Sequence, residues 1–161
     1  MAISSDHSRP LDAIDRRILD ALQRNGRISN LALAAGIGLT ATPCQERVRR
    51  LEREGYIKGY EARLDPARLG LGLTVFVQVT LDRTTPAIFD HFAKAVAGIP
   101  HLAECHMVAG GFDYLLKLRV GDMTQFREIL GDHLAAIGGV AQTHTYVVME
   151  EVKAETCLPV L

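Results

Sequence analysis

The hydrophobic period changes once along this chain of 161 residues, and that change limits the folds that the chain can adopt. Between Leu11 and Leu51, apolar residues recur at spacings of three and four, which is the period of helices that bury one face. From Leu73 onward, runs rich in β-branched residues alternate with helical segments. We therefore expect an α+β protein in which a small helical part precedes a part built on a sheet.

The helical part contains the signals of three short helices. Asp12 and Asp15 form a capping pair for the first helix, Ser29 is the N-cap of the second, and Gly36 is expected to end it. A tight turn at residues 36–39 joins the second helix to the third, and this arrangement is typical of a helix-turn-helix. In that motif the helix after the turn enters the major groove of duplex DNA.

The third helix begins at Thr40 or Thr42 and ends at Gly55. Its first turns offer short polar side chains suited to base edges, and its arginines lie further along, where they can reach phosphates. Spacings of three and four also allow these arginines to pair with glutamates of the same helix, and both interpretations stay open. The residues expected to contact DNA are Arg27, Ser29, Thr40, Thr42, Pro43, Gln45, Glu46, Arg47, Arg49 and Arg50.

The second part has the segment order βαββαβ, which predicts a ferredoxin-like fold. In such a fold the helices cover one face of the sheet. The other face is expected here to be apolar and to need a partner, so we expect dimerisation through it. The expected strands are 73–81, 101–109, 112–120 and 140–152, and the expected helices are 88–96 and 122–137.

Charge and cysteine content narrow the class of protein. The formal net charge is -1, yet residues 1–59 carry ten basic and seven acidic residues, whereas residues 60–161 carry eight and twelve. The N-terminal part is thus mildly attractive to phosphate. Three cysteines without a Cys-x-x-Cys motif indicate a reducing compartment, and the first ten residues lack the apolar stretch of a secretory signal. The uncharged stretch 28–45 is too interrupted for a bilayer helix, so we expect a cytoplasmic protein without membrane contact.

Five stretches carry a distinctive combination of residues. They are residues 11–19 (LDAIDRRIL), 25–29 (NGRIS), 42–52 (TPCQERVRRLE), 111–117 (GFDYLLK) and 145–153 (TYVVMEEVK). Together, over nearly the whole chain, they resemble the Lrp/AsnC, or feast/famine, family of transcription regulators.

The resemblance implies a sequence-specific DNA-binding regulator of amino-acid metabolism that responds to a small amino acid such as leucine. It implies no enzymatic activity and no cofactor besides that effector. Members of the family form homodimers that assemble further, often into octamers, and they bind double-stranded promoter or operator DNA. The implied domains are a flexible arm (1–10), a helix-turn-helix domain (11–63), a linker (64–72), a ferredoxin-like effector-binding and oligomerisation domain (73–153) and a C-terminal tail (154–161).

The resemblance also implies an effector site at the loop between the second and third strands, facing the last strand. Backbone N–H groups of Gly110 and Gly111 would hold a carboxylate there, and Asp113 would receive an ammonium group. A turn-forming role explains Asp113 as well, and β propensity explains Thr143 and Thr145. The expected effector-binding residues are Val108, Gly110, Gly111, Phe112, Asp113, Tyr114, Thr143 and Thr145.

Other functions stay open on the sequence alone. Ferredoxin-like domains also occur in small enzymes and in stand-alone amino-acid-binding modules, and a helix-turn-helix protein can wrap DNA without sequence preference. No nucleophile–base or paired-carboxylate arrangement is identifiable from spacing, so no catalytic residue is expected. His101, Cys105 and His106 suggest a metal cluster, but adjacent strand residues point to opposite faces, so no metal site is expected.

Overall fold

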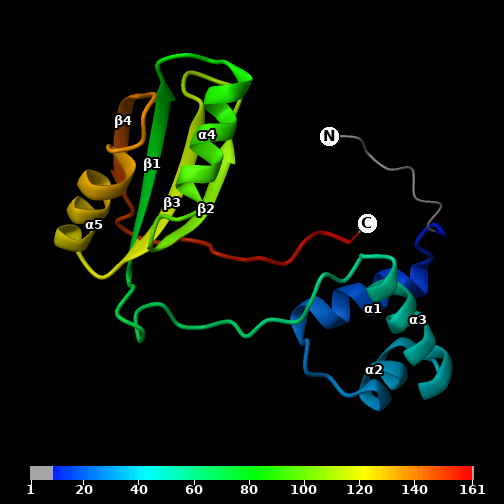
Figure 1. Ribbon diagram of the computed structural model, residues 1–161. Coiled ribbons are helices and arrows are strands. Elements are labelled where there is room, and N and C mark those ends of the chain that lie inside the picture. The colour runs from blue at the N-terminus through cyan, green and yellow to red at the C-terminus, as the bar shows by residue number, and fades with distance from the viewer. Residues whose placement is uncertain (1–8, 161) are drawn as a thin grey trace. The chain divides into compact units, whose positions relative to one another are not determined.

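A computed structural model describes residues 9–160 and divides the chain into two compact units (Figure 1). Of the described residues, 9–63 together with 154–160 form the first unit, and 64–153 form the second. The first unit therefore includes the C-terminal tail as well as the helical part. Most of the arm expected at 1–10 lies outside the described residues. The elements are α1 (Ala13–Arg24), α2 (Asn30–Ile37), α3 (Ala41–Arg53), β1 (Leu73–Leu81), α4 (Pro86–Val96), β2 (Leu102–Met107), β3 (Tyr114–Val120), α5 (Met123–Ile129), the π-helical turn η1 (Leu130–Leu134) and β4 (Val140–Val147).

Side-chain caps decide where the first two helices begin. The Asp15 N–H donates to the Asp12 carboxylate over 2.8 Å, and the Asp12 N–H donates to the Asp15 carboxylate over 3.1 Å. This reciprocal pair at the start of α1 confirms the predicted capping pair. At the start of α2, the Ser29 hydroxyl accepts a hydrogen bond from the Ala32 N–H, which confirms Ser29 as the N-cap.

The turn between α2 and α3 depends on a different glycine from the predicted one. The predicted end of α2 at Gly36 is wrong, because Gly36 is still helical and the helix continues to Ile37. Gly38 then takes a left-handed conformation, with φ of 77°, which side-chain-bearing residues rarely adopt. The next residue, Leu39, donates its N–H to the Ala34 carbonyl over 2.9 Å and closes the turn. Gly38 thereby sets the direction in which α3 leaves.

The three helices share a small apolar core. Burial raises the pKa of the Cys44 thiol, so this cysteine stays a neutral core residue, as expected for the apolar side of α3. The buried side chains come from all three helices and are Ile18, Leu33, Ala34, Ile37, Cys44 and Leu51.

A buried carboxylate fastens α3 to α1. The Asp15 side chain is completely buried, and Arg47 donates to one of its oxygens over 2.8 Å while Arg50 donates to the other. Arg47 also donates to Asp12 over 2.6 Å. The pKa of the Asp12 carboxyl is lowered to about 2. The hydrogen bond from Arg47 is the main cause, and the hydrogen bond from the Asp15 N–H is the second. A buried charge is costly without such partners, so the two arginines stabilise the packing of α3 against α1.

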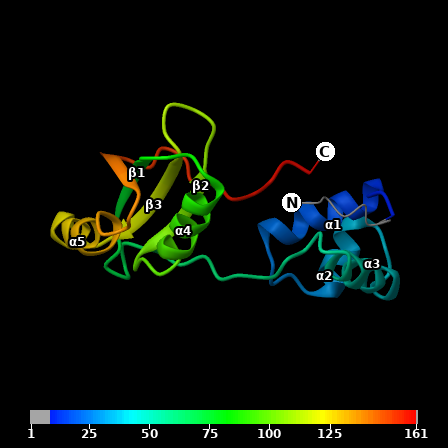
Figure 2. The ribbon, with the colours of Figure 1, turned by 45° about the horizontal axis from the view of Figure 1, so that its top comes forward.

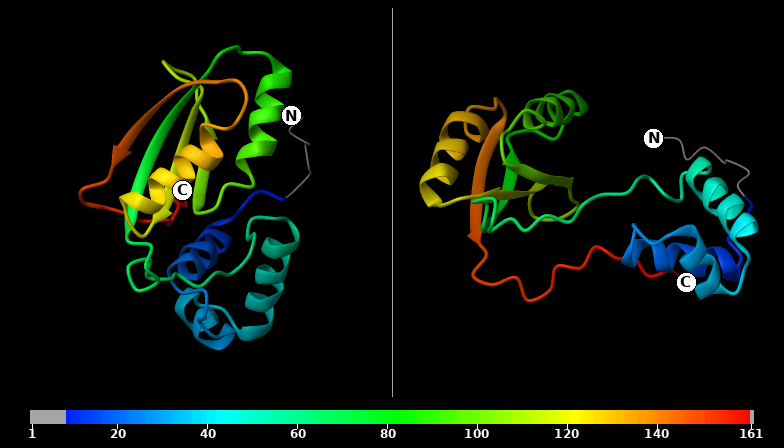
Figure 3. Two further views of the ribbon diagram at one scale, coloured as in Figure 1. Left: turned by 60° about the vertical axis from the view of Figure 1, so that its left-hand side comes forward. Right: turned by 90° about the horizontal axis from the view of Figure 1, so that it is seen from below.

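The second unit contains a four-stranded antiparallel sheet in the order β2-β3-β1-β4, which is the predicted βαββαβ arrangement. Alternate residues of β1, namely Val75, Val77 and Val79, are buried with Phe92 of α4 and Phe126 of α5 in one core. Figures 2 and 3 show both helices against the same face of the sheet.

Two elements end earlier than the sequence predicts. The helix expected at 122–137 is α-helical only in its first half, and it continues as the π-helical turn η1, which contains a glycine that weakens regular helix. The strand expected at 140–152 ends at Val147, which lies opposite Val75 near the start of β1. One further hydrogen bond, from the Val148 N–H, reaches the Thr74 carbonyl.

The sheet face away from the helices is only in part the apolar surface that the sequence predicts. Lys117 and Arg119 of β3 lie on it, because the residues between them fill the core. Lys117 pairs with Glu104 of β2 over 2.9 Å, and Arg119 pairs with Glu151 over 2.7 Å. Phe76 and Tyr146 lie in the same row as Lys117, so this face is mixed. The expectation of an apolar face therefore holds only in part, and the expectation that helices leave this face open is confirmed.

Replacing Asp15 with asparagine is expected to destabilise the helical unit by about 3–5 kcal/mol, because Arg47 and Arg50 lose their buried counter-charge. Urea unfolding, followed by hydrogen exchange of the α1 and α3 amides, measures this loss. Asp20→Asn is the matched control on the same helix, since Asp20 pairs with the exposed Arg24 and its loss should matter far less. Equal losses in both variants would contradict the role given to Asp15.

Candidate nucleic-acid interface and effector loop

The first turns of α3 present a polar surface to solvent. Thr42, Gln45 and Glu46 are exposed, and the side chain of Thr40, the N-cap residue, makes no capping hydrogen bond. The opposite side of α3 is buried in the core, so the helical period turns these polar side chains outward. Pro43 is half-buried in the first turn, where a helix needs no N–H group.

Contacts with the other two helices hold this surface in place. The Asn30 side-chain amide, at the start of α2, donates to the Ala41 carbonyl at the start of α3 over 2.8 Å. The Arg17 guanidinium of α1 donates to the Gly36 carbonyl of α2 over 3.1 Å. Together with the buried ion pairs of Asp15, these bonds connect each helix of the unit to another. The exposed face of α3 is thus preorganised for binding.

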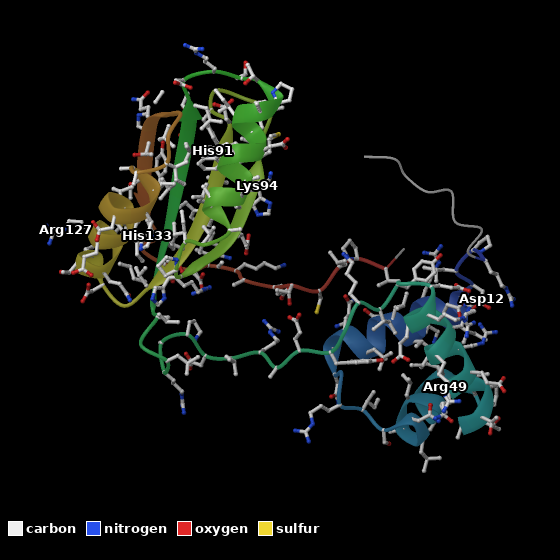
Figure 4. All side chains as sticks on the ribbon, viewed as in Figure 1. Asp12, Arg49, His91, Lys94, Arg127 and His133 are labelled. Atoms are coloured by element: carbon white, nitrogen blue, oxygen red, sulfur yellow. The ribbon has the colours of Figure 1, made fainter. Side chains whose placement is uncertain are left out.

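The predicted arginines have different surroundings. Arg47 and Arg50 are held against α1 by the two carboxylates described above, so they do not join the exposed polar residues. Arg49 is exposed, and no hydrogen bond or ion pair engages it within residues 9–160 (Figure 4). Arg27 is exposed in the turn before α2, whereas Ser29 uses its hydroxyl to cap that helix. The structure therefore leaves Arg27 and Arg49 available for a phosphate.

The glutamate pairing that the spacing allows is present at Arg50, whose Nε lies 4.0 Å from the Glu54 carboxylate. Sequence reasoning misses the shorter ion pairs with Asp15, because it considers only glutamates close along the chain. A signal for the true partner exists in the sequence. Asp15 lies three residues before Ile18, on the same stripe of α1 that enters the core, and a carboxylate there requires a cation. Arg47 and Arg50 are also three residues apart, so both reach the same side of α3.

Hydrogen bonds fix both ends of the loop between β2 and β3. The Val108 N–H donates to the Asp113 carbonyl over 2.9 Å, and the Asp113 N–H donates to the Val79 carbonyl over 3.0 Å. The Asp113 carboxylate accepts a hydrogen bond from the Leu81 N–H over 2.7 Å. Asp113 thus joins the start of β3 to the end of β1, and this bond supports its interpretation as a turn-forming residue.

The middle of this loop is open. Within residues 9–160, no hydrogen bond engages the backbone N–H of Gly110 or Gly111, and both glycines are exposed. A Cβ atom at either position would meet nothing within 4 Å. Successive free N–H groups of this kind can bind a carboxylate. Phe112, between the glycines and Asp113, is half-buried.

Strand register places one of the two predicted threonines level with the end of the loop, with β1 between them. Tyr114, Val79 and Thr143 form one row across β3, β1 and β4, next to Asp113. Thr145 lies one pair of residues further from the loop. Tyr114 itself is buried, its ring centroid lies 4.4 Å from that of Phe92, and burial raises the pKa of its hydroxyl. Tyr114 therefore supports the loop from the core.

The residues that suggested a metal cluster do not share a face of the sheet. Cys105 packs against the core, whereas His106 lies 3.1 Å from Glu104 on the open face. Among residues 9–160, no group of three or more histidine, cysteine or acidic side chains could hold a metal ion. In the same part of the chain, no helix has the length and apolar character needed to cross a membrane.

Two family descriptions match this chain. "Winged helix-turn-helix DNA-binding" matches residues 11–58, and "Lrp/AsnC ligand binding domain" matches residues 74–158. With the exposed face of α3 and the four-stranded sheet, these matches define a ligand-responsive, DNA-binding transcriptional regulator. The chain belongs to the Lrp/AsnC family.

The proteins that it resembles are regulators. The leucine-responsive regulatory proteins of Klebsiella pneumoniae and of Escherichia coli (strain K12) are each 54% identical to it over 145 residues, which is 90% of this chain and 88% of theirs. The structure of a Neisseria meningitidis transcriptional regulator in complex with L-methionine aligns with a TM-score of 0.89 and 35% identity, covering 93% of this chain and 97% of that one. An AsnC family regulator from Agrobacterium tumefaciens aligns with a TM-score of 0.88 and 30% identity, covering 92% and 97%.

Asp113→Ala is expected to destabilise the second unit by about 1–3 kcal/mol, because the Leu81 N–H loses its acceptor in a partly buried position. Asp113→Asn keeps an oxygen of the same shape at this position and should retain most of the stability. Thermal unfolding monitored by circular dichroism compares the two variants with the unmodified protein. If Asp113→Ala had the melting temperature of the unmodified protein, the structural role given to this carboxylate would be wrong.

Proposed function

We propose that two copies of this chain bind one operator, each inserting the first turns of α3 into a major groove. The exposed polar face of α3 is the observation that carries this proposal. This face carries the short polar side chains of Thr40, Thr42 and Gln45, which can form hydrogen bonds with base edges in the groove. The Glu46 carboxylate can accept a hydrogen bond from cytosine. In a dimer the two helices would lie about 34 Å apart, which is one turn of the duplex.

Phosphate contacts are assigned to the arginines that the fold leaves free. Arg49 and Arg27 are exposed without a carboxylate partner among residues 9–160. Arg47 and Arg50 act instead as positioning residues, because Asp15 engages both guanidinium groups. Ser29 caps α2 and Pro43 lies in the first turn of α3, and at such helix starts backbone N–H groups can approach a phosphate.

The dimer is proposed to assemble further, up to an octamer. Support comes from the second unit, whose sheet has one face without helices. Near the end of β4 and just after it, large apolar or aromatic side chains are exposed on this unit and would be covered in an assembly. They are Tyr146, Val147, Met149 and Val152. Because such a regulator acts on promoter DNA, its proposed location is the cytoplasm.

The proposed effector is a small aliphatic amino acid, with leucine as the first candidate. Its carboxylate would accept hydrogen bonds from the free N–H groups of Gly110 and Gly111, and Val108 and Phe112 would contact its side chain. Thr143 lies at the same end of the sheet, with Thr145 beyond it. The names of the relatives support this class, since two are called leucine-responsive and the Neisseria regulator was solved with L-methionine.

Arg49→Ala is expected to weaken binding to operator and random duplexes by the same factor, because a phosphate interaction carries no sequence information. The slope of log affinity against log salt should fall by about 0.9, the value for one phosphate that is no longer neutralised. Thr42→Ala should instead change which sequence is preferred and leave the salt slope unchanged. Fluorescence anisotropy over a salt series measures both effects.

Arg83→Ala is the control for this pair, since it removes the same charge from an exposed arginine of the second unit. It should bind DNA as the unmodified protein does. If Arg49→Ala and Thr42→Ala changed the sequence preference alike, the division of α3 into base and phosphate contacts would be wrong.

Gly111→Pro is expected to abolish the rise in melting temperature that leucine produces, because proline lacks the N–H group proposed to bind the carboxylate. Gly111→Ala is the matched control: it keeps the N–H group, and its Cβ atom meets nothing within 4 Å. A thermal-shift screen of the twenty amino acids measures the response, since a ligand of the native state raises its stability. A full response in Gly111→Pro would move the effector away from this loop.

A further inference from the structure

Hydrogen bonds to a glutamine of α1 hold the C-terminal tail on the helical unit, and the Arg63 guanidinium adds a long hydrogen bond to the Ala154 carbonyl over 3.5 Å. The Gln23 side-chain amide donates to the Leu158 carbonyl over 2.8 Å, and its oxygen accepts from the Leu158 N–H over 2.9 Å. One side-chain amide thus pairs with both backbone groups of one residue, as a neighbouring strand would. The Cys157 thiol adds a weak hydrogen bond to the Gln23 carbonyl over 3.7 Å. The right-hand view of Figure 3 shows this segment beside α1.

The chemistry of the tail suits this interaction. Residues 156–160 carry no charge, and Pro159 biases Leu158 toward the extended backbone that presents its N–H and C=O to Gln23. The tail borders a groove of about 710 Å³ with apolar side chains from α1, from the residues just before α1 and from the segment after α3. Those side chains are Leu11, Leu19, Leu22 and Ile57. The lining also includes Arg16 and Lys58. An extended peptide with apolar side chains and no positive charge, such as residues 156–160, is compatible with this lining.

The tail is docked shallowly, and this makes its docking reversible. The Leu158 side chain is 74% exposed, and Val160 is only half-buried. Two hydrogen bonds and little buried area amount to a weak interaction. Because the tail is part of the same chain, its effective concentration at the groove is nevertheless of the order of millimolar. A docked and an undocked tail are thus close in free energy.

The tail contacts α1 and not the proposed DNA-reading face. Its hydrogen bonds with Gln23 and Arg63 involve no residue of α3, and the groove that it borders contains none either. Docking therefore leaves Thr42, Gln45 and Arg49 uncovered. Its effect on DNA binding must come from where the helical unit is held, and not from blocking α3.

We propose that residues 154–160 form a strap, which docks reversibly on α1 through Gln23 and gives the helical unit a second connection to the sheet unit. Residues 66–70 of the predicted linker form a hydrogen-bonded turn, so without the strap the five residues 61–65, which lie in no helix, strand or turn, limit the movement of the helical unit to about 17 Å when extended. A docked strap shortens this range. This inference rests on the proposed dimeric DNA binding, because the strap then restricts the half-site spacings that a dimer can bridge.

The first experiment tests docking in the full chain without DNA. Gln23→Ala is expected to speed cleavage of the tail by carboxypeptidase and exchange of the amides at 56–60, each by about tenfold, because both hydrogen bonds to Leu158 are removed. Gln142→Ala, the same change at an exposed position of β4, is the matched control and should leave both rates unchanged. A chain that ends at Lys153 shows the exchange expected of a free groove. If Gln23→Ala and the shortened chain both exchange like the unmodified protein, the strap does not dock.

The second experiment tests the consequence on DNA. Affinities are measured for duplexes with one half-site and with two half-sites at increasing separations. The unmodified protein should prefer one spacing, and Gln23→Ala and the shortened chain should lose most of that preference while binding a single half-site equally well. An unchanged preference in both variants would overturn the strap as a restraint. If no variant, nor the unmodified protein, binds any duplex, the proposed DNA binding fails, and the exchange experiment still decides whether the strap docks.

Discussion

The carboxylate of Asp15 is the constraint on which the helical unit depends. It has no access to water and is compensated by two arginines from a helix that begins more than twenty residues later. A charge in this position tolerates little displacement of its partners, because any gap exposes it to an apolar surrounding. The position of α3 against α1 is therefore fixed more sharply than apolar packing alone would fix it. The outward face of α3 inherits this rigidity.

In the loop between β2 and β3, as in the helical unit, the residues that hold the backbone in place differ from those proposed to bind. Asp113 and Tyr114 face the strands and the core, and their hydrogen bond and ring contact hold the loop ends. Gly110 and Gly111, between these supports, keep their N–H groups free. A site with fixed ends and free donors loses little entropy when a ligand binds. Keeping this geometry requires the turn-forming role of Asp113, so the two interpretations of that residue are not exclusive.

Local signals in the sequence were sufficient for most elements and insufficient for partners distant in the chain. The capping pair Asp12–Asp15 and the order βαββαβ follow from short-range patterns, and the structure confirms both. The choice between Gly36 and Gly38 as the end of α2 depends on backbone conformation, which composition does not reveal. The partners of Arg47 and the pairing of Gln23 with Leu158 depend on tertiary folding, and no spacing rule along one helix predicts them.

The two sets of interactions that involve α1 differ in strength, and the difference has a functional meaning. The Asp15 carboxylate that pairs with the arginines of α3 is buried, and these ion pairs hold the two helices together in the folded state. The hydrogen bonds between Gln23 and Leu158 lie at the surface, and the Leu158 side chain is exposed. A small effector changes an equilibrium by only about 1–3 kcal/mol. That amount could not rearrange the buried ion pairs, but it is comparable with the free energy of a shallow interaction made of two hydrogen bonds. A regulator that keeps its DNA-reading face intact must therefore respond through weak connections of this kind, and not through the interior of the helical unit.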